Sequence, residues 1–224
     1  ERKLNLWHAP NKVYMELQQL TRERDQIVAE RSAIKNQLHA ETIQAKPNTN
    51  SVRRLKERIA FLNRQEKEIK GEIDVIIDNN EDVKKEIKNI ISIPGIGKLT
   101  AVIVLAETNG FELIRNKKQL TSYAGLDVKE KQSGTSVRGK PRISKKGNRS
   151  LRKAMYLPSL SAVKYDENFK GQYVRIVSKH GIKKKGLIAV QRKMLELIYT
   201  LFKNKTVYDK NYESKKSSAK ILVA

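Results

Sequence analysis

Two runs of apolar residues, spaced to lie along one side of a helix, dominate the first third of the chain. The first run keeps steps of three and four residues if two arginines take seam positions, and it consists of Val13, Leu17, Leu20, Arg24, Ile27, Arg31, Ile34 and Leu38. The second run consists of Leu55, Ile59, Leu62, Ile69, Ile73 and Ile76. Pro and Asn in AKPNTNS at 45–51 break the pattern between them. The sequence therefore predicts two long helices with the narrow seams of a coiled coil.

The partner of these two helices is open at this stage. They can fold back on each other as a hairpin, or they can pair with another subunit. Arg24 and Arg31 lie on the predicted seam, so either arrangement needs a group that pairs their charges. We predict a coiled-coil region at 11–80 that makes a homodimer or tetramer, with a purely internal hairpin as the alternative. Residues 1–10 are interpreted as a linker.

The charge of the chain points to a polyanionic partner. There are 47 Lys and Arg against 24 Asp and Glu, a net charge of +23, which favours nucleic acid over a membrane. Ten of the cations lie between Lys131 and Tyr165, where there is no acid at all. No apolar run reaches the ~18 residues of a spanning helix. The absence of cysteine fits a reducing cytoplasm, and the three histidines have no metal-ligand spacing.

A tight helix–turn–helix is predicted next. Val83, Ile87 and Ile90 lie on one helix that runs into ISIPGIGK, where Pro94, Gly95 and Gly97 force a turn before a helix restarts at Leu99. This pattern is typical of a helix-hairpin-helix, whose turn offers backbone N–H groups to a phosphate, with Lys98 adding charge. A purely structural turn between two helices is the alternative.

The acid-free stretch begins with a hydroxyl-rich loop, Ser133 to Ser136. Five cations follow within thirteen residues of Ser133, namely Arg138, Lys140, Arg142, Lys145 and Lys146. A phosphodiester held by these cations would lie beside a serine hydroxyl, which is the geometry of phosphoryl transfer to serine. A free hydroxyl needs activation to act as a nucleophile, and an ordinary turn is the simpler interpretation.

The remaining sequence predicts further helices. One lies within Phe111–Leu126, with Tyr123 packed in the core, and another spans Arg149–Lys164, capped by Asn148 or Ser144. In the second helix we expect an inward apolar face of Leu151, Met155, Leu157, Leu160 and Val163. Helices at 169–180 and 187–203 follow, and the tail past Asp209 is predicted to be disordered. Lys183–Lys185 is either a second phosphate contact or a solvated run.

These observations predict a mainly α-helical fold, with a long coiled-coil hairpin followed by a compact helical domain at 81–209. The residues predicted to contact nucleic acid are Gly95, Gly97, Lys98, Arg138, Lys140, Arg142, Lys145, Lys146, Asn148, Arg149 and Arg152.

Four motifs in a fixed order carry a resemblance to a known family. They are SIPGIG at 92–97, QLTSYAGL at 119–126, QSGTSVRG at 132–139 and ISKKGNRSLRKAMY at 143–156. Together they resemble the C-terminal part of the DEDD transposases of bacterial insertion sequences, relatives of the Piv-type DNA invertases that are also called bridge-RNA-guided recombinases. The resemblance extends over nearly all of Leu4–Tyr208, because the first long helix resembles that family's coiled-coil region.

The resemblance implies a split active site. In this family a RuvC-like N-terminal domain binds divalent metal, here expected to be Mg²⁺, through four carboxylates, and the transposase domain contributes a serine that becomes covalently attached to DNA. That serine matches Ser133. The family also binds a structured guide RNA, which pairs with donor and target DNA, and assembles as dimers and tetramers.

The chain begins at Glu1, beyond the place where a RuvC-like domain would end, so we expect the metal-binding carboxylates to be absent. Four acids near the predicted turn give no substitute metal site, namely Glu107, Glu112, Asp127 and Glu130. The expectation is a cytoplasmic, nucleoid-associated recombinase fragment that holds no cofactor and is inactive alone. A non-catalytic nucleic-acid-binding and oligomerisation module is the alternative, and a structural-maintenance type of coiled coil is disfavoured by the acid-free stretch.

Overall fold

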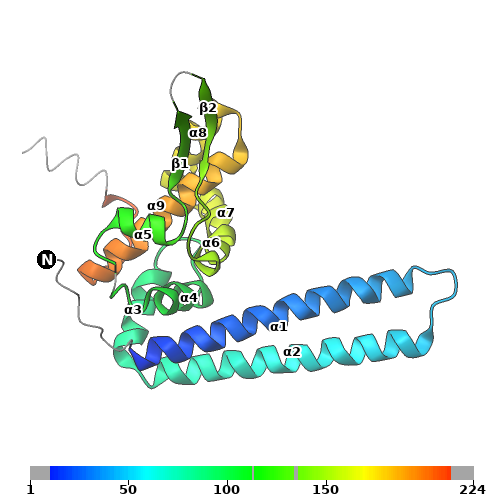
Figure 1. Ribbon diagram of the computed structural model, residues 1–224. Coiled ribbons are helices and arrows are strands. Elements are labelled where there is room, and N and C mark those ends of the chain that lie inside the picture. Colours follow the sequence, from blue (N-terminus) through cyan, green and yellow to red (C-terminus); the bar gives the residue numbers. More distant parts are fainter. Residues whose placement is uncertain (1–10, 113, 134–135, 213–224) are drawn as a thin grey trace, which may run out of the picture. The chain divides into compact units, whose positions relative to one another are not determined.

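The computed structural model describes residues 11–112, 114–133 and 136–212 (Figure 1). The chain divides into two compact units, Glu1–Glu81 and Asp82–Ala224. The described part is mainly α-helical, which confirms the predicted fold class. It also contains a two-stranded antiparallel sheet that the sequence did not predict.

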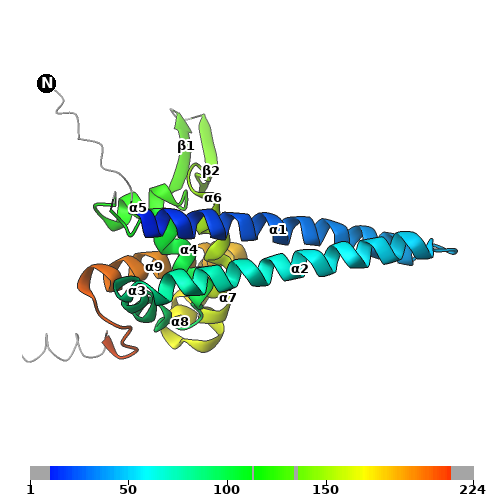
Figure 2. The same cartoon turned by 90° about the horizontal axis from the view of Figure 1, so that it is seen from below.

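The first unit is a pair of long helices, α1 (Lys12–Thr42) and α2 (Thr49–Asp78). Figures 1 and 2 show them side by side along their length. Each begins at an asparagine whose side chain accepts a backbone N–H of the first turn, since Asn11 caps α1 and Asn48 caps α2. The two predicted helices and the break between them are confirmed. The chain supplies its own partner for each helix, while association with a second chain stays a prediction.

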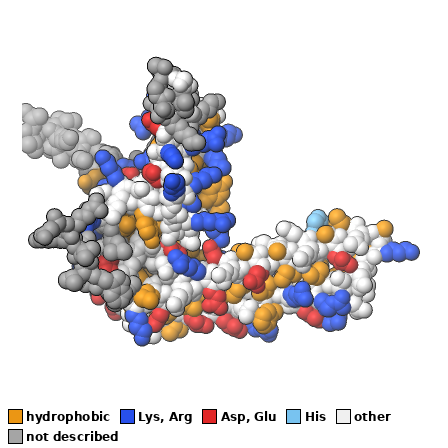
Figure 3. All heavy atoms as spheres, in the orientation of Figure 1, with side chains coloured by type: hydrophobic (Ala, Val, Ile, Leu, Met, Phe, Trp, Pro, Cys, Tyr) orange, Lys and Arg blue, Asp and Glu red, His pale blue; other side chains and the backbone are white. Residues whose placement is uncertain are grey.

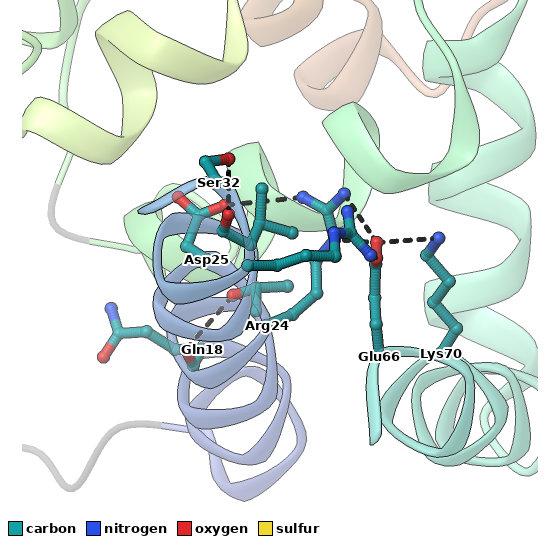
Figure 4. A network of polar contacts seen from close by, with 9 residues as sticks. Gln18, Arg24, Asp25, Ser32, Glu66 and Lys70 are labelled. Carbon is teal, nitrogen blue, oxygen red and sulfur yellow. Dashed lines mark hydrogen bonds and ion pairs between the residues drawn. The ribbon is translucent and has the colours of Figure 1, made fainter. Parts of the chain in front are cut away.

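Glu66 of α2 neutralises both seam arginines (Figure 4). Its carboxylate accepts from Arg24 Nη2 at 3.0 Å and from Arg31, while Lys70 Nζ lies 2.9 Å from the same group. Burial alone would raise the pKa of Glu66, but hydrogen bonds from Lys70, Arg31 and Arg24 outweigh that effect and lower the pKa from 4.5 to about 2. The predicted need for a charge partner is therefore met within the helix pair.

The second unit begins with α3 (Glu81–Ile91), a short turn and α4 (Lys98–Thr108). Ile93 and Ile96 of the turn are buried, and so is every residue of α4 from Ala101 to Thr108. A helix that is buried on all sides lies in the centre of a core rather than on its surface. The predicted turn between two helices is present, whereas its assignment as a helix-hairpin-helix and its binding of phosphate stay predictions.

Seven further elements follow this core helix in the chain. They are α5 (Lys117–Tyr123), β1 (Val128–Ser133), β2 (Val137–Ile143), α6 (Arg149–Ala154), α7 (Tyr156–Tyr165) and α8 (Glu167–His180), followed by α9 (Lys183–Asn204). α4 packs on α6, α5 on α9, and α7 on both α8 and α9. Phe111 fills the centre, with its ring centroid 5.4 Å from that of Tyr199 and 5.0 Å from that of Phe202.

Three expectations about these helices are wrong. The single helix at Arg149–Lys164 is divided at Met155 into α6 and α7, because Pro158 has no N–H to donate to the carbonyl four residues earlier. The break changes the direction of the following side chains, so Leu157 is 70% exposed and Leu160 45% exposed instead of buried. Tyr123 is 42% exposed instead of packed in the core, with its hydroxyl donating to the backbone oxygen of Glu107 at 2.9 Å.

The segment after α9 returns to the start of the second unit. Tyr208 donates its hydroxyl to Asp166 Oδ2 at 2.9 Å, and its backbone N–H donates to Ser92 Oγ at 2.8 Å. Burial raises the pKa of Tyr208. The predicted linker at 1–10 and the end of the predicted tail, at 213–224, lie outside the described residues.

Candidate nucleic-acid interface

The β1–β2 hairpin begins at Val128, three residues before the acid-free stretch, and contains one acid, Glu130. Val128 pairs with Ile143 and Lys129 with Arg142 at its base, and Ser133 pairs with Val137 at the far end. Between these pairs the register shifts, so that Glu130 faces two residues, Lys140 and Pro141. Pro141 has no N–H to give to a ladder, which suits it to such an irregularity. The basic loop expected from sequence is thus largely an extended hairpin.

The predicted nucleophile lies at the end of a strand. Ser133 is the last residue of β1, and residues 134–135 of the predicted hydroxyl-rich loop lie outside the described residues. The side chains of Ser133, Arg138 and Lys140 are likewise outside the described part, so their roles stay predictions. The backbone register alone places Arg138 opposite Gln132, one step from Ser133.

Two glycines fix the base of the hairpin against the helices. Gly147 has a φ of +139°, and a Cβ there would lie 2.4 Å from the carbonyl oxygen of Tyr123 and 2.9 Å from the backbone nitrogen of Gly125. Gly125 has a φ of +66°, and a Cβ there would lie 2.8 Å from the carbonyl oxygen of Lys146. Only glycine fits this mutual approach of two backbones. We call residues 122–127 together with 144–148 the junction.

Asn148 and Arg152 tie the junction to the core. Asn148 Oδ1 accepts the N–H of Leu151 and so caps α6, while Asn148 Nδ2 donates to Oε2 of the buried Glu107 at 2.7 Å. Arg152 Nη1 donates to the carbonyl oxygens of Ala124 and Gly147, at 2.8 and 3.2 Å. Both residues were predicted to contact nucleic acid. Each has a structural role in the protein, and a role in binding stays a prediction.

Ser144 and Asp127 close the other side of the junction. Ser144 Oγ donates to Asp127 Oδ1 at 2.6 Å, and the Ser144 N–H donates to the Asp127 carbonyl oxygen at 2.8 Å. Ser144 was one of two suggested caps for the following helix, and the structure gives that role to Asn148. Lys145 has a left-handed backbone, with a φ of 53°, and donates its N–H to Gly125.

Cations surround this rigid junction on the outside. Figure 3 shows Lys and Arg side chains gathered over the hairpin and its base. The exposed members are Lys129, Arg142, Lys145, Lys146, Arg149 and Lys153. Two acids lie close to them in the chain, Asp127 of the junction and Glu130 of β1, so the positive charges remain in excess. We call this set the junction cations.

The turn between α3 and α4 packs on the rest of the second unit through one of its glycines. Gly95 has a φ of +90°, and a Cβ there would lie 2.7 Å from the carbonyl oxygen of Pro158, so the turn packs on α7. Gly97 caps α4 without a side-chain hydrogen bond and has open space around its Cα. Lys98 is exposed. The turn is therefore both a structural contact, through Gly95, and an open backbone edge at Gly97.

Sequence reasoning missed the residues that hold the interface together. Glu107 and Asp127 were considered only as metal ligands, yet they anchor Asn148 and Ser144. Gly125 and Gly147 were seen only as helix boundaries. Among the described residues, no group of three or more His, Cys, Asp or Glu is placed to hold a metal ion. No helix in the same part of the chain is long and apolar enough to cross a membrane.

Residues 87–174 match the family model for "Transposase IS116/IS110/IS902 family". The matched span runs from α3 to α8 and so includes the hairpin, the junction and the junction cations. Over these residues the chain is thus similar to a family of transposases.

Curated relatives are similar over about half of the chain. Proteins named "Pilin gene-inverting protein" from Moraxella bovis and Moraxella lacunata are each 32% identical over 123 residues, which cover 54% of this chain and 38% of the relative. The "Insertion element IS110 uncharacterized 43.6 kDa protein" of Streptomyces coelicolor is 28% identical over 120 residues, or 54% of this chain and 29% of the relative. The alignments thus span less than half the length of these relatives.

Proposed function

We propose that this chain is part of a DNA recombinase of the transposase and invertase type, and that the hairpin and the junction cations bind the DNA backbone at the reacting strand. The observation that carries the proposal is the strongly basic hairpin, in which Glu130 is the one acid against five Lys and Arg, mounted on a junction fixed by close backbone contacts. The family match over 87–174 and the similarity to a pilin gene-inverting protein support it. Rigid placement of charge is what a site acting on a phosphodiester needs.

The binding is directed to phosphates rather than bases. Lys and Arg side chains that face a duplex neutralise phosphates and release counterions. For each contacted phosphate, the logarithm of the binding constant then falls by about 0.9 when the salt concentration rises tenfold. Such contacts position a protein on DNA without reading its sequence. Sequence choice would then come from elsewhere, and the family resemblance suggests pairing by a guide RNA.

Ser133 is the proposed nucleophile. Its Oγ would form a bond to phosphorus while the bond from phosphorus to the 3′ oxygen breaks, and the departing 3′ oxygen takes a proton. A second 3′-hydroxyl then displaces the serine, so one phosphodiester is exchanged for another without hydrolysis. Arg138 and Arg142 would neutralise charge on the phosphate during both steps.

The remaining parts of the proposal involve groups other than this chain. Mg²⁺ would be held by a RuvC-like domain, and the residues described in this chain do not form a site for it. A guide RNA and association as dimers or tetramers through α1 and α2 complete the proposal. The competing function is a non-catalytic module that only binds nucleic acid and oligomerises.

A strand-transfer assay separates the two functions. In a protein that joins this chain to a RuvC-like domain, Ser133→Ala is expected to abolish transfer between two labelled duplexes, while DNA affinity changes less than about twofold. Ser136→Ala, a matched serine on the exposed turn of the same hairpin, is expected to retain both transfer and binding. Strand transfer by Ser133→Ala at the unsubstituted rate would exclude Ser133 as the nucleophile and favour the non-catalytic module.

A further inference from the structure

The helical hairpin of α8 and α9 carries a second acid-free cationic segment, separate in sequence from the first. From Asn168 to Leu195 there is no Asp or Glu, and the segment contains Lys170, Arg175, Lys179, Lys183, Lys184, Lys185, Arg192 and Lys193. Five basic side chains cluster around the turn between the helices, within seven residues: Lys179, His180, Lys183, Lys184 and Lys185. All five are exposed. We call this group the α8–α9 tip.

The charge at the tip opposes the stability of the fold. Lys183–Lys185 form the first turn of α9, where the helix dipole favours acids, and that turn contains no acid and no side-chain cap. Among the described residues the structure records no ion pair for these three lysines. Adjacent unpaired cations at a helix start repel each other and the dipole. A partner that brings negative charge would remove this cost.

The tip is rigid. Gly186 is buried against α8, and a Cβ there would lie 2.8 Å from Val177 Cγ2 and 2.9 Å from Tyr173 Cδ2. Gly181 ends α8 with a left-handed φ of 68°, and its N–H donates to Val177 at 2.7 Å. The lysines are therefore carried by a tight two-helix turn, so their backbones lose little conformational entropy when a ligand binds.

We propose that the α8–α9 tip is a second phosphate-backbone site, which binds a nucleic-acid duplex. Closely spaced cations without acids suit a polyanion such as a duplex, which carries one phosphate per about 1.7 Å of axis. The proposal rests on the proposed function only in taking nucleic acid as the partner. It adds a surface distinct from the junction cations, so the chain can hold a duplex at two places or two duplexes at once.

The test compares three variants of the full chain by fluorescence anisotropy with a labelled 30-base-pair DNA duplex and an RNA duplex of the same length, from 50 to 300 mM salt. The tip variant carries Lys183→Gln, Lys184→Gln and Lys185→Gln. The junction variant carries Lys145→Asn and Lys146→Gln, since Asn tolerates the left-handed backbone at 145. The control carries Lys35→Gln, Lys56→Gln and Lys67→Gln, which remove the same charge from exposed positions of α1 and α2.

We expect the tip variant to lose about tenfold or more in affinity at 0.1 M salt and to lower the salt slope by up to about 2.7, while the control changes much less. Its melting temperature should stay the same or rise by up to about 4 °C, because charge opposed to the helix dipole is removed. Weaker binding of only one duplex identifies whether DNA or RNA is the ligand, and either result supports the site. A triple Lys→Arg variant at the same positions should bind as the unsubstituted chain does.

Unchanged affinity and salt slope with both duplexes would overturn the inference. If the junction variant still binds weakly in that case, the proposed function stands without a second site. If only the tip variant binds weakly, the second site stands and the junction cations lose their proposed role.

Discussion

Asn148 Nδ2 donates a hydrogen bond of 2.7 Å to Oε2 of Glu107, which is only 2% exposed. One amide side chain thereby caps α6 and satisfies a buried carboxyl group on α4. The bond connects the core helix to the base of the hairpin across a separation of 41 residues. The position of the junction cations therefore depends on a contact deep inside the second unit.

Replacing Asn148 should lower the free energy of unfolding of the protein. Asn148→Ala removes the cap, which should lower the free energy of unfolding by about 1 kcal/mol. It also leaves the buried Glu107 carboxyl without this donor, which should lower the free energy by a further ~1–2 kcal/mol. Asn148→Asp keeps a capping oxygen but sets two carboxyl groups against each other. Adding Glu107→Gln to Asn148→Asp should recover stability, because the Gln amide can donate to Asp. Urea unfolding followed by circular dichroism measures this cycle, and equal stability of Asn148→Asp and the parent would contradict it.

Gly147→Ala should be among the most damaging small substitutions in the second unit. The added Cβ would lie 2.4 Å from the Tyr123 carbonyl oxygen, and the φ of +139° is strained for any other residue. We expect a loss of more than about 2 kcal/mol in thermal unfolding. Gly171→Ala is the matched control, because that glycine lies inside α8 with nothing within 4 Å of a Cβ. Gly171→Ala should raise the free energy of unfolding by about 0.5–1 kcal/mol. Similar effects of the two substitutions would contradict the packing argument.

Glu66→Gln should destabilise the α1–α2 pair. The change removes the charge that neutralises Arg24 and Arg31 in a half-buried seam, which typically costs about 3 kcal/mol. Glu57→Gln on the same helix breaks only an exposed pair with Arg53, so its effect should stay within about 0.5 kcal/mol. Hydrogen exchange of α1 and α2 amides measures both variants. Equal protection in the two would show that the Glu66 network contributes no more than a surface pair.

The same residue predicts an acid dependence. The pKa of Glu66 is about 2 in the folded protein against an ordinary value of 4.5, so the unfolded chain binds the proton more tightly. The stability that ionised Glu66 provides is therefore complete above about pH 5 and is lost as the pH falls towards 2. The difference in unfolding free energy between parent and Glu66→Gln should shrink over that interval. A difference that stays constant between pH 7 and pH 3 would contradict the assigned pKa.

The helix pair could be read from the sequence because its signal is periodic. Apolar residues at steps of three and four define α1 and α2. The two arginines on the seam also predicted a charge partner, and the structure identifies that partner as Glu66. The periodicity cannot say whether a seam packs on its own chain or another. Within one chain, the structure shows that α1 packs on α2.

The hairpin could not be read in the same way. VKEKQS and VRGKPRI have no alternation of apolar and polar residues, so the usual strand signal is missing. The division of α6 from α7 had a signal in Pro158, which was overlooked in favour of the apolar spacing of Leu157 and Leu160. The junction itself depends on contacts between segments some twenty residues apart, such as Gly125 with Gly147, which no local pattern records.

The most direct measurement is the position of a covalent bond between protein and DNA. In a protein that joins this chain to a RuvC-like domain, a nicked suicide duplex should trap an adduct that resists denaturant, and peptide mass spectrometry should find the nucleotide on Ser133, with no adduct in Ser133→Ala. An adduct on any other residue, or one that persists in Ser133→Ala, would contradict the account.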